Sequence, residues 1–215
     1  MLDDAQARRL MVDCQLRTFD VTNVAVLDAF GAVPRERFVP ADRAAFAYSD
    51  QTLRLGPDRA MPAPMLLARM IQALAVEPGA RFLDVAAGYG YGAAILSGLG
   101  AEGVALEPDA ALAAGARERL AGRPGVSVVE AALDGGPTEG GPFDVILVEG
   151  RVEVRPQGLL DQLADGGRLV CVMGRDRAAK ATLFVRAGSA FGSRPLFDAA
   201  LPALPGFAAD AGFVF

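Results

Sequence analysis

The sequence predicts an α/β fold with a doubly wound, mostly parallel sheet, helices on both faces and an N-terminal helical segment. Three observations predict it. From residue 79, short apolar segments alternate with segments of helical periodicity, which is the pattern of parallel strands joined by crossover helices. A glycine-rich turn follows the first of these apolar segments. The 215 residues are 52% hydrophobic and 22% charged, as expected of one well-buried domain.

Residues 1–78 are expected to form a helical and irregular cap segment. Apolar residues recur at helical spacing in its first two helices, and the expected core-facing positions are Leu10, Cys14, Val24, Leu27 and Phe30. Prolines in VPRERFVP, residues 33–40, end the second helix. Residues 45–64 have no sustained period, which is typical of a loop or short strands. A third helix is predicted over residues 65–74, with Pro64 in its first turn.

Residues 79–215 are expected to form the sheet domain. The predicted strands are residues 81–85, 103–107, 126–130, 143–149 and 168–173, with two further candidates at 182–188 and 193–199. The predicted helices are residues 91–98, 109–120 and 157–163. Residues 201–215 read as a tail punctuated by prolines.

The stretch FLDVAAGYGYGAA, residues 82–94, predicts a ligand site at the end of the first strand. Gly88 and Gly90 allow a sharp turn and a close approach of backbone to ligand, and the helix that follows directs free N–H groups toward it. In open parallel sheets, ligands bind beyond the carboxyl ends of the strands. The next strand ends at Glu107, at a separation where an acidic side chain commonly accepts hydrogen bonds from two ribose hydroxyls. A nucleoside ligand is therefore predicted.

Two nucleoside cofactors fit this loop. Gly88, Gly90 and Ala93 satisfy the dinucleotide pattern G-x-G-x-x-G/A, whereas a carboxylate at Asp84 favours the ammonium group of S-adenosylmethionine. Simpler interpretations also exist: Glu107 as a solvated strand end, and Asp84 as a buried carboxylate whose oxygens accept backbone N–H bonds.

Composition excludes several classes of function. The net charge is −5, and no basic stripe suits a phosphate backbone, so nucleic acid is not expected as a partner. Apolar runs end well short of the ~20 residues that span a membrane, and we expect a cytoplasmic protein. Two cysteines allow no disulfide framework or multi-cysteine metal site. The chain has no histidine, which argues against serine hydrolases and zinc enzymes, and no metal is expected.

Several segments resemble protein-L-isoaspartate O-methyltransferases in order and spacing. They are VPRERFVP, AYSD at 47–50, the turn before Pro64, FLDVAAGYGYGAA, VALEPD at 104–109, GPFDVILVEG at 141–150 and LLDQLADGGRLV at 159–170. The resemblance covers residues 7–173. It implies a Rossmann-like class I methyltransferase, which transfers a methyl group from S-adenosylmethionine to a carboxylate of a protein or peptide.

The resemblance also implies roles for individual residues. Those expected to bind the cofactor are Asp84, Ala86, Gly88 and Gly90 at the methionine part, Glu107 at the ribose, and Ala132 and Leu133 near the adenine. Tyr48 and Asp50 are candidates for binding the acceptor, with ordinary loop packing as the alternative. Arg35 and Arg37 suit either an acidic substrate or surface salt bridges, and Tyr89 and Tyr91 either line the cofactor or face solvent.

Three positions depart from the family pattern. Ala86 stands where the family has glycine, which requires a negative φ there. Ala132 stands where the family usually has an aspartate, and Asp134 would replace it only if the loop shifts. Pro62 stands at the position of the active-site serine and supplies neither a hydroxyl nor a backbone N–H.

Four functions therefore remain open. The first is a methyltransferase of the isoaspartyl type. The second is a paralogue with a different methyl acceptor, and the third is an S-adenosylmethionine-binding regulatory protein without turnover. A nicotinamide-dependent oxidoreductase is the fourth, and the chain lacks the Tyr-x-x-x-Lys pair or histidine that would relay its proton.

Overall fold

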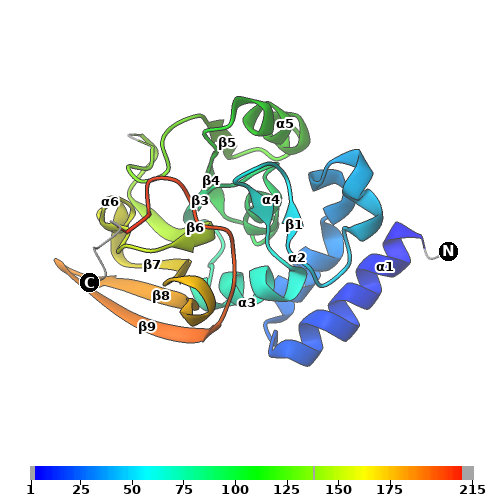
Figure 1. The fold of residues 1–215 in the computed structure, drawn as a ribbon, viewed down its shortest axis with the longest axis horizontal. Helices are drawn as coiled ribbons and strands as arrows, with labels where there is room; N and C mark the ends of the chain where they lie inside the picture. Colours follow the sequence, from blue (N-terminus) through cyan, green and yellow to red (C-terminus); the bar gives the residue numbers. More distant parts are fainter. Residues whose placement is uncertain (1–2, 138, 210–215) are drawn as a thin grey trace, which may run out of the picture.

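A seven-stranded sheet forms the centre of the chain (Figure 1). The computed structural model describes residues 3–137 and 139–209, so part of the predicted tail, residues 210–215, lies outside the described residues. The strand order is β5-β4-β3-β6-β7-β8-β9. The strands are β3 (Arg81–Val85), β4 (Glu102–Leu106), β5 (Val126–Val129), β6 (Phe143–Val152), β7 (Leu163–Met173), β8 (Lys180–Ala187) and β9 (Ala190–Asp198). The first five are parallel, and β8 and β9 extend the sheet as antiparallel strands.

Neighbouring residues of a strand point to opposite faces of the sheet, and both faces are buried here. Phe82 of β3 packs in the cluster formed with the α-helices α2 (Val24–Ala32), α3 (Pro64–Leu74) and α4 (Tyr91–Gly98). Leu83 packs in the opposite cluster with the short helix α6 (Gln157–Leu160) and the tail residues Leu204 and Phe207. The mostly parallel α/β fold is confirmed.

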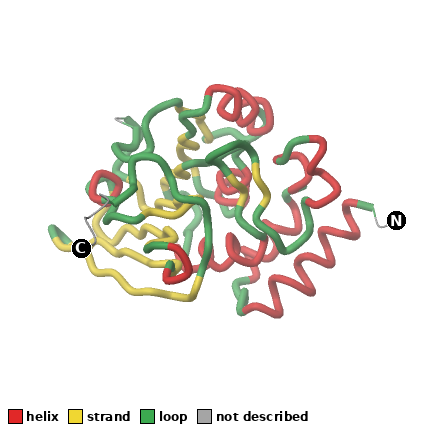
Figure 2. Tube along the Cα trace, viewed as in Figure 1, coloured by secondary structure: helices red, strands yellow, loops and turns green. Residues whose placement is uncertain are grey.

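Helices are distributed unevenly around the sheet. Figure 2 shows most of them on the side of the N-terminus, where α1 (Asp4–Met11) and α2 lie, while strands and loops predominate on the side of the C-terminus, where the short α6 also lies. The fifth helix, α5 (Ala110–Leu120), lies beside β5 and is capped by Asp109, whose Oδ1 accepts the N–H groups of Ala111 and Leu112. No helix in residues 3–137 and 139–209 is long and apolar enough to cross a bilayer.

The core-facing residues of the first helix differ from the prediction. Leu10 is 46% exposed and Cys14 is exposed, whereas Met11 and Leu16 are buried. The physical reason is that α1 continues as a π-helix over Val12–Leu16, which separates core-facing residues by five positions in place of four. In α2, Leu27 and Phe30 are buried as expected.

Two further predictions are corrected. Val24 is 63% exposed, because it is the first residue of α2 after its N-cap Asn23. The helix predicted over residues 157–163 ends at Leu160, since Leu163 pairs with Phe143 and begins β7. Pairing with the central sheet has overridden helical periodicity there.

Residues 33–61, before α3, form short elements. Two 3₁₀ turns, η3 (Arg35–Phe38) and η4 (Ala41–Phe46), are followed by an antiparallel hairpin of β1 (Leu53–Arg54) and β2 (Ala60–Met61). This hairpin pairs only two residues in each strand. The turn of this hairpin lies over the glycine-rich loop.

Candidate functional site

The glycine-rich loop connects β3 to α4 at the carboxyl edge of the parallel sheet. Three of its residues have left-handed backbone angles: Ala86 with φ 62°, Gly88 with φ 56° and Gly90 with φ 85°. The expected negative φ at Ala86 is therefore wrong. Because a non-glycine residue pays roughly 1–2 kcal/mol in this conformation, Ala86 carries strain that the family's glycine would not.

Both glycines of the loop are places of close approach. A side chain at Gly88 would collide with Leu55 of the β1–β2 hairpin, and a Cβ at Gly90 would lie 2.6 Å from Leu120 Cδ1 of α5. The space over Gly88, where a ligand was predicted to approach the backbone, is filled by the chain's own hairpin.

Glu107 follows β4 and is 0% exposed, so it is not a solvated strand end. Its Oε2 accepts the Gly88 N–H at 2.9 Å, and its Oε1 accepts the Asp109 N–H at 3.0 Å. Arg59 Nε contacts both carboxylate oxygens, at 3.0 Å and 3.2 Å. Glu107 therefore lies beside the glycine loop with Arg59 as an additional partner, and its predicted role in binding ribose hydroxyls stays a prediction.

A pair of buried carboxyl groups lies beside the first turn of α4. Asp84 of β3 and Glu149 of β6 point to the same face of the sheet, where a Cβ at Gly92 would lie 2.9 Å from Asp84 Oδ2 and would collide with Glu149. No hydrogen bond of good geometry reaches either oxygen of Asp84 or Oε1 of Glu149. The Ala93 N–H and the Glu149 carboxyl nevertheless lie close enough to Asp84 to lower its pKa by hydrogen bonding, so the interpretation of Asp84 as a carboxylate with backbone N–H partners stays a prediction.

Burial changes the titration of this pair. It raises the pKa of Asp84 to about 7, and the nearby negative charge of Glu107 acts in the same direction. Burial likewise raises the pKa of Glu149 well above its ordinary value, reinforced by the charge of Asp84. Two adjacent buried carboxyl groups with unpaired oxygens suit a cationic ligand, because a positive charge would favour their ionised form.

Arg35 is fully buried and connects the segment around Pro62 to α4. Its Nε donates to Ala47 O at 2.7 Å and its Nη2 donates to Pro62 O at 2.6 Å. The guanidinium also lies 4.9 Å from the centre of the Tyr91 ring, which packs against Phe30. Arg35 is therefore a buried residue, and the interpretation of it as a surface salt-bridge partner is wrong, whereas contact with an acidic substrate stays a prediction. Tyr91 is likewise a core residue.

The two candidates for acceptor binding lie in different surroundings. Tyr48 is half-buried, and its hydroxyl donates to Glu36 and accepts from Arg8 Nη1 at 3.1 Å. Asp50 is exposed and lines a small pocket that also contains Arg69 and Phe197. The structure does not bring Asp50 and Tyr48 together in one pocket with the glycine loop.

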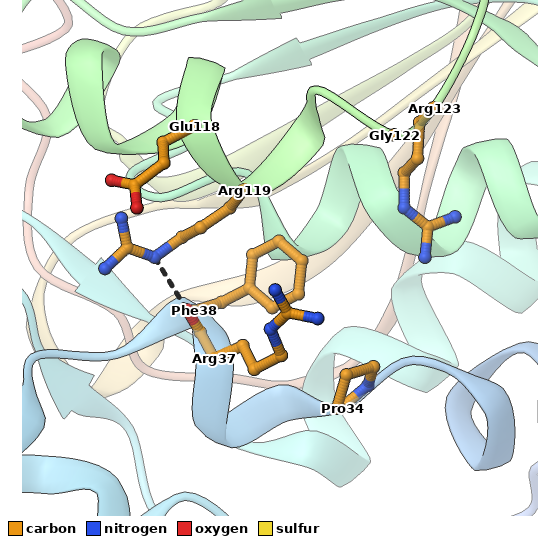
Figure 3. A pocket seen from close by; sticks show the side chains of 7 residues that line it. All are labelled: Pro34, Arg37, Phe38, Glu118, Arg119, Gly122 and Arg123. Atoms are coloured by element: carbon orange, nitrogen blue, oxygen red, sulfur yellow. Dashed lines mark hydrogen bonds between the residues drawn. The ribbon is translucent and has the colours of Figure 1, made fainter.

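Arg37 lines a separate pocket of about 410 Å³ between η3 and the end of α5 (Figure 3). Its main-chain oxygen accepts from Arg119 Nε at 2.6 Å, and the Arg119 guanidinium lies 4.3 Å from the centre of the Tyr89 ring. Tyr89 is thus covered by α5. Arg123 also borders this pocket, which makes it basic.

The residues expected near the adenine are divided between surface and core. Ala132 is exposed, whereas Leu133 is buried with the cluster on the α6 side of the sheet. Among residues 3–137 and 139–209, no group of three or more His, Cys, Asp or Glu side chains is arranged to hold a metal ion.

Sequence reasoning missed Glu149 and Arg59. Glu149 had a usable signal, because it ends an apolar strand at the same edge of the sheet as Asp84 and Glu107. Arg59 had none, since only the folding of the hairpin over the loop places it beside Glu107.

The strand order and the glycine loop define a Rossmann-like α/β fold. Its acidic residues Asp84, Glu107 and Glu149 lie at the carboxyl edge of the parallel strands, where such folds bind ligands. Residues 6–194 match the family model "Protein-L-isoaspartate(D-aspartate) O-methyltransferase (PCMT)". The chain belongs to this family.

Similar proteins agree with this assignment. A protein-L-isoaspartate O-methyltransferase of Methylorubrum populi is 47% identical over 176 residues, which are 81% of this chain and 82% of that protein. One from Koribacter versatilis is 38% identical and covers 78% of this chain and 76% of its own length.

Solved structures share the fold. A protein-L-isoaspartate O-methyltransferase aligns with a TM-score of 0.81 and 24% identity, over 93% of this chain and 66% of that one. A candidate protein-L-isoaspartate O-methyltransferase from Plasmodium falciparum, in complex with S-adenosyl-L-homocysteine, aligns with a TM-score of 0.79 and 18% identity. It covers 92% of this chain and 97% of that one.

Proposed function

We propose that this protein is an S-adenosylmethionine-dependent methyltransferase that methylates a carboxylate of a protein or peptide. Membership of the isoaspartyl methyltransferase family is the observation that carries the proposal. It favours a methyltransferase over the nicotinamide-dependent oxidoreductase that the glycine pattern also allowed. We place the protein in the cytoplasm, and its net charge of −5 gives nucleic acid no electrostatic attraction.

The residues present fit this cofactor at its cationic end. The buried carboxyl groups of Asp84 and Glu149 suit an ammonium group by charge, and the absence of a side chain at Gly92 keeps the approach to them from being blocked. At the ribose end, Glu107 is the matching carboxylate, although Arg59 contacts both of its oxygens. The site therefore fits the cofactor once Arg59 has moved.

Bound S-adenosylmethionine would supply a methyl group on a positively charged sulfur, and the protein would supply position and charge. Asp84 and Glu149 would hold the cationic part, and Glu107 the two ribose hydroxyls. A carboxylate acceptor, with a reference pKa of about 4, is already ionised at neutral pH and needs no general base. A chain without histidine can therefore support this reaction.

The identity of the acceptor depends on the segment around Pro62. Pro62 is buried, and its carbonyl is held by Arg35, so the backbone here is fixed although the family's serine hydroxyl is missing. This observation favours a paralogue with another protein acceptor, or a cofactor-binding protein without turnover, as the second candidate function.

Methyl transfer can be tested directly. The protein is incubated with radiolabelled S-adenosylmethionine and either an isoaspartyl peptide, the matching aspartyl peptide or a whole-cell protein extract. Label in the isoaspartyl peptide alone supports repair activity, and label only in the extract supports another acceptor. No label in any sample, with binding of the cofactor verified by calorimetry, contradicts turnover.

The Pro62→Ser variant tests whether the missing serine hydroxyl limits methylation of the isoaspartyl peptide. Because the main-chain oxygen is retained, the bond from Arg35 should persist. We expect the variant to gain label in the isoaspartyl peptide relative to the original chain. The matched control is Pro124→Ser, a change in the exposed turn before β5, which should leave the rate unchanged.

A further inference from the structure

Arg59 Nε–H is shared between both oxygens of Glu107, on the side of the carboxylate that the backbone N–H groups leave available. A carboxylate offers about four acceptor positions. Two of those on Glu107 are used by the N–H groups of Gly88 and Asp109, and Arg59 Nε contacts both oxygens from the remaining side. A pair of ribose hydroxyls also needs two positions, so Arg59 and a ribose cannot bind Glu107 together.

The contact is built into the interior. Arg59 is 8% exposed, while its neighbours Pro57 and Asp58 are exposed. Its Nη1 donates to Asp58 O at 2.9 Å, which fixes the direction of the guanidinium. Leu55, the first residue after β1, covers Gly88 directly. The side chains of Leu55 and Arg59 thus cover the glycine loop and Glu107.

The hairpin itself is a weak structure. Its ladder consists of two residue pairs, Leu53 with Met61 and Arg54 with Ala60, and two-stranded hairpins are marginally stable at best. The main-chain oxygen of Arg59 accepts the N–H of Leu55 at 2.9 Å. Leu53 and Met61 anchor the two strands in the core, so it is the turn between them, residues 55–59, whose position depends on the contacts of Arg59 and Leu55 with the site.

We propose that Arg59 is an intramolecular competitor for the ribose of the cofactor, and that the β1–β2 hairpin is a latch that must open before ribose hydroxyls reach Glu107. This inference rests on the proposed function and adds the control of its cofactor site. In the closed state, the positive charge of Arg59 neutralises Glu107. In the open state, the ribose hydroxyls take its place, and the apparent affinity falls with the fraction of closed molecules.

The test measures the affinity of the full chain for S-adenosylhomocysteine by calorimetry. Arg59→Ala is compared with Arg59→Gln, which keeps a donor for Glu107 and guards against misfolding around an unpaired buried charge. We expect Arg59→Ala to bind at least about tenfold more tightly and Arg59→Gln to show a smaller gain, because its amide still donates to Glu107 without the charge. The matched control is Arg54→Ala on the same hairpin. Arg54 is exposed and bonds only Pro57 O, at 3.3 Å, so its removal should change little.

A second ligand pair tests the mechanism. The gain in affinity from Arg59→Ala should appear with adenosine and disappear with 2′,3′-dideoxyadenosine, which lacks the hydroxyl pair. An unchanged or weaker affinity of the Arg59 variants for S-adenosylhomocysteine, or an equal gain for both nucleosides, would overturn the proposal.

Hydrogen exchange separates failure of the latch from failure of the proposed function. If no variant binds S-adenosylhomocysteine, the proposed function fails. The ligand-free protein still reports on the latch, because Arg59→Ala should speed amide exchange at Leu55 and Gly88. Unchanged exchange at both amides would show that Arg59 does not hold the hairpin closed.

Discussion

The buried pair Asp84 and Glu149 should make this protein less stable as the pH rises, and Asp84→Asn should remove much of that loss. The pKa of Asp84 is raised from 3.8 to about 7, first by burial and then by the charge of Glu107. Between these values the folded state keeps a proton that the unfolded state has released. The free energy of unfolding therefore falls as the pH rises from about 4 to about 7, and the loss is complete above that range.

The size of the effect follows from the shift. A difference of about three pKa units at ~1.36 kcal/mol per unit corresponds to about 4 kcal/mol. Asn has nearly the same shape as Asp and does not ionise. We therefore expect Asp84→Asn to raise the free energy of unfolding by up to about 4 kcal/mol at pH 8 and to change it little at pH 4.

Urea denaturation at several pH values measures this difference. The chain has no tryptophan, so far-ultraviolet circular dichroism is the suitable probe. Glu118→Gln, which changes an exposed carboxylate on α5, is the matched control and should leave the pH profile unchanged. A gain for Asp84→Asn that is equal at pH 4 and pH 8, or no gain at pH 8, would refute the reasoning.

Three further substitutions test the packing of the site by chemical denaturation. Gly92→Ala should destabilise the fold by about 1–3 kcal/mol, since its Cβ would collide with Glu149, whereas Gly122→Ala meets nothing within 4 Å and should be near neutral. Ala86→Gly should stabilise by up to about 1 kcal/mol because φ is 62°, and a loss of stability there would contradict the strain. Arg35→Ala should cost about 3 kcal/mol by leaving two buried carbonyl groups unpaired, and a change below 1 kcal/mol would show that water replaces them.

Most of the architecture was predictable because it depends on local patterns. Apolar runs such as residues 81–85 bury both faces of a strand, and α3 and α4 begin and end close to their predicted limits. The exceptions are Val12–Leu16, where a π-helix changes the spacing, and residues 161–163, where pairing with β6 replaces helix. In the second place a longer-range contact outweighs local periodicity, and in the first the helix type changes it.

The sequence by itself determined the edge of the sheet at which the site lies, because a glycine loop after one strand and an acidic residue after the next must meet at the carboxyl ends of parallel strands. Asp84 and Glu107 were found in this way. Only the tertiary structure decided how they are occupied. Glu149 leaves Asp84 beside a second buried carboxyl group, and Arg59 reaches Glu107 from a segment 48 residues earlier in the chain. The contact of Arg59 with Glu107 depends on how the hairpin folds back over the glycine loop. The hairpin segment has no hydrophobic periodicity, so the sequence alone does not predict that contact.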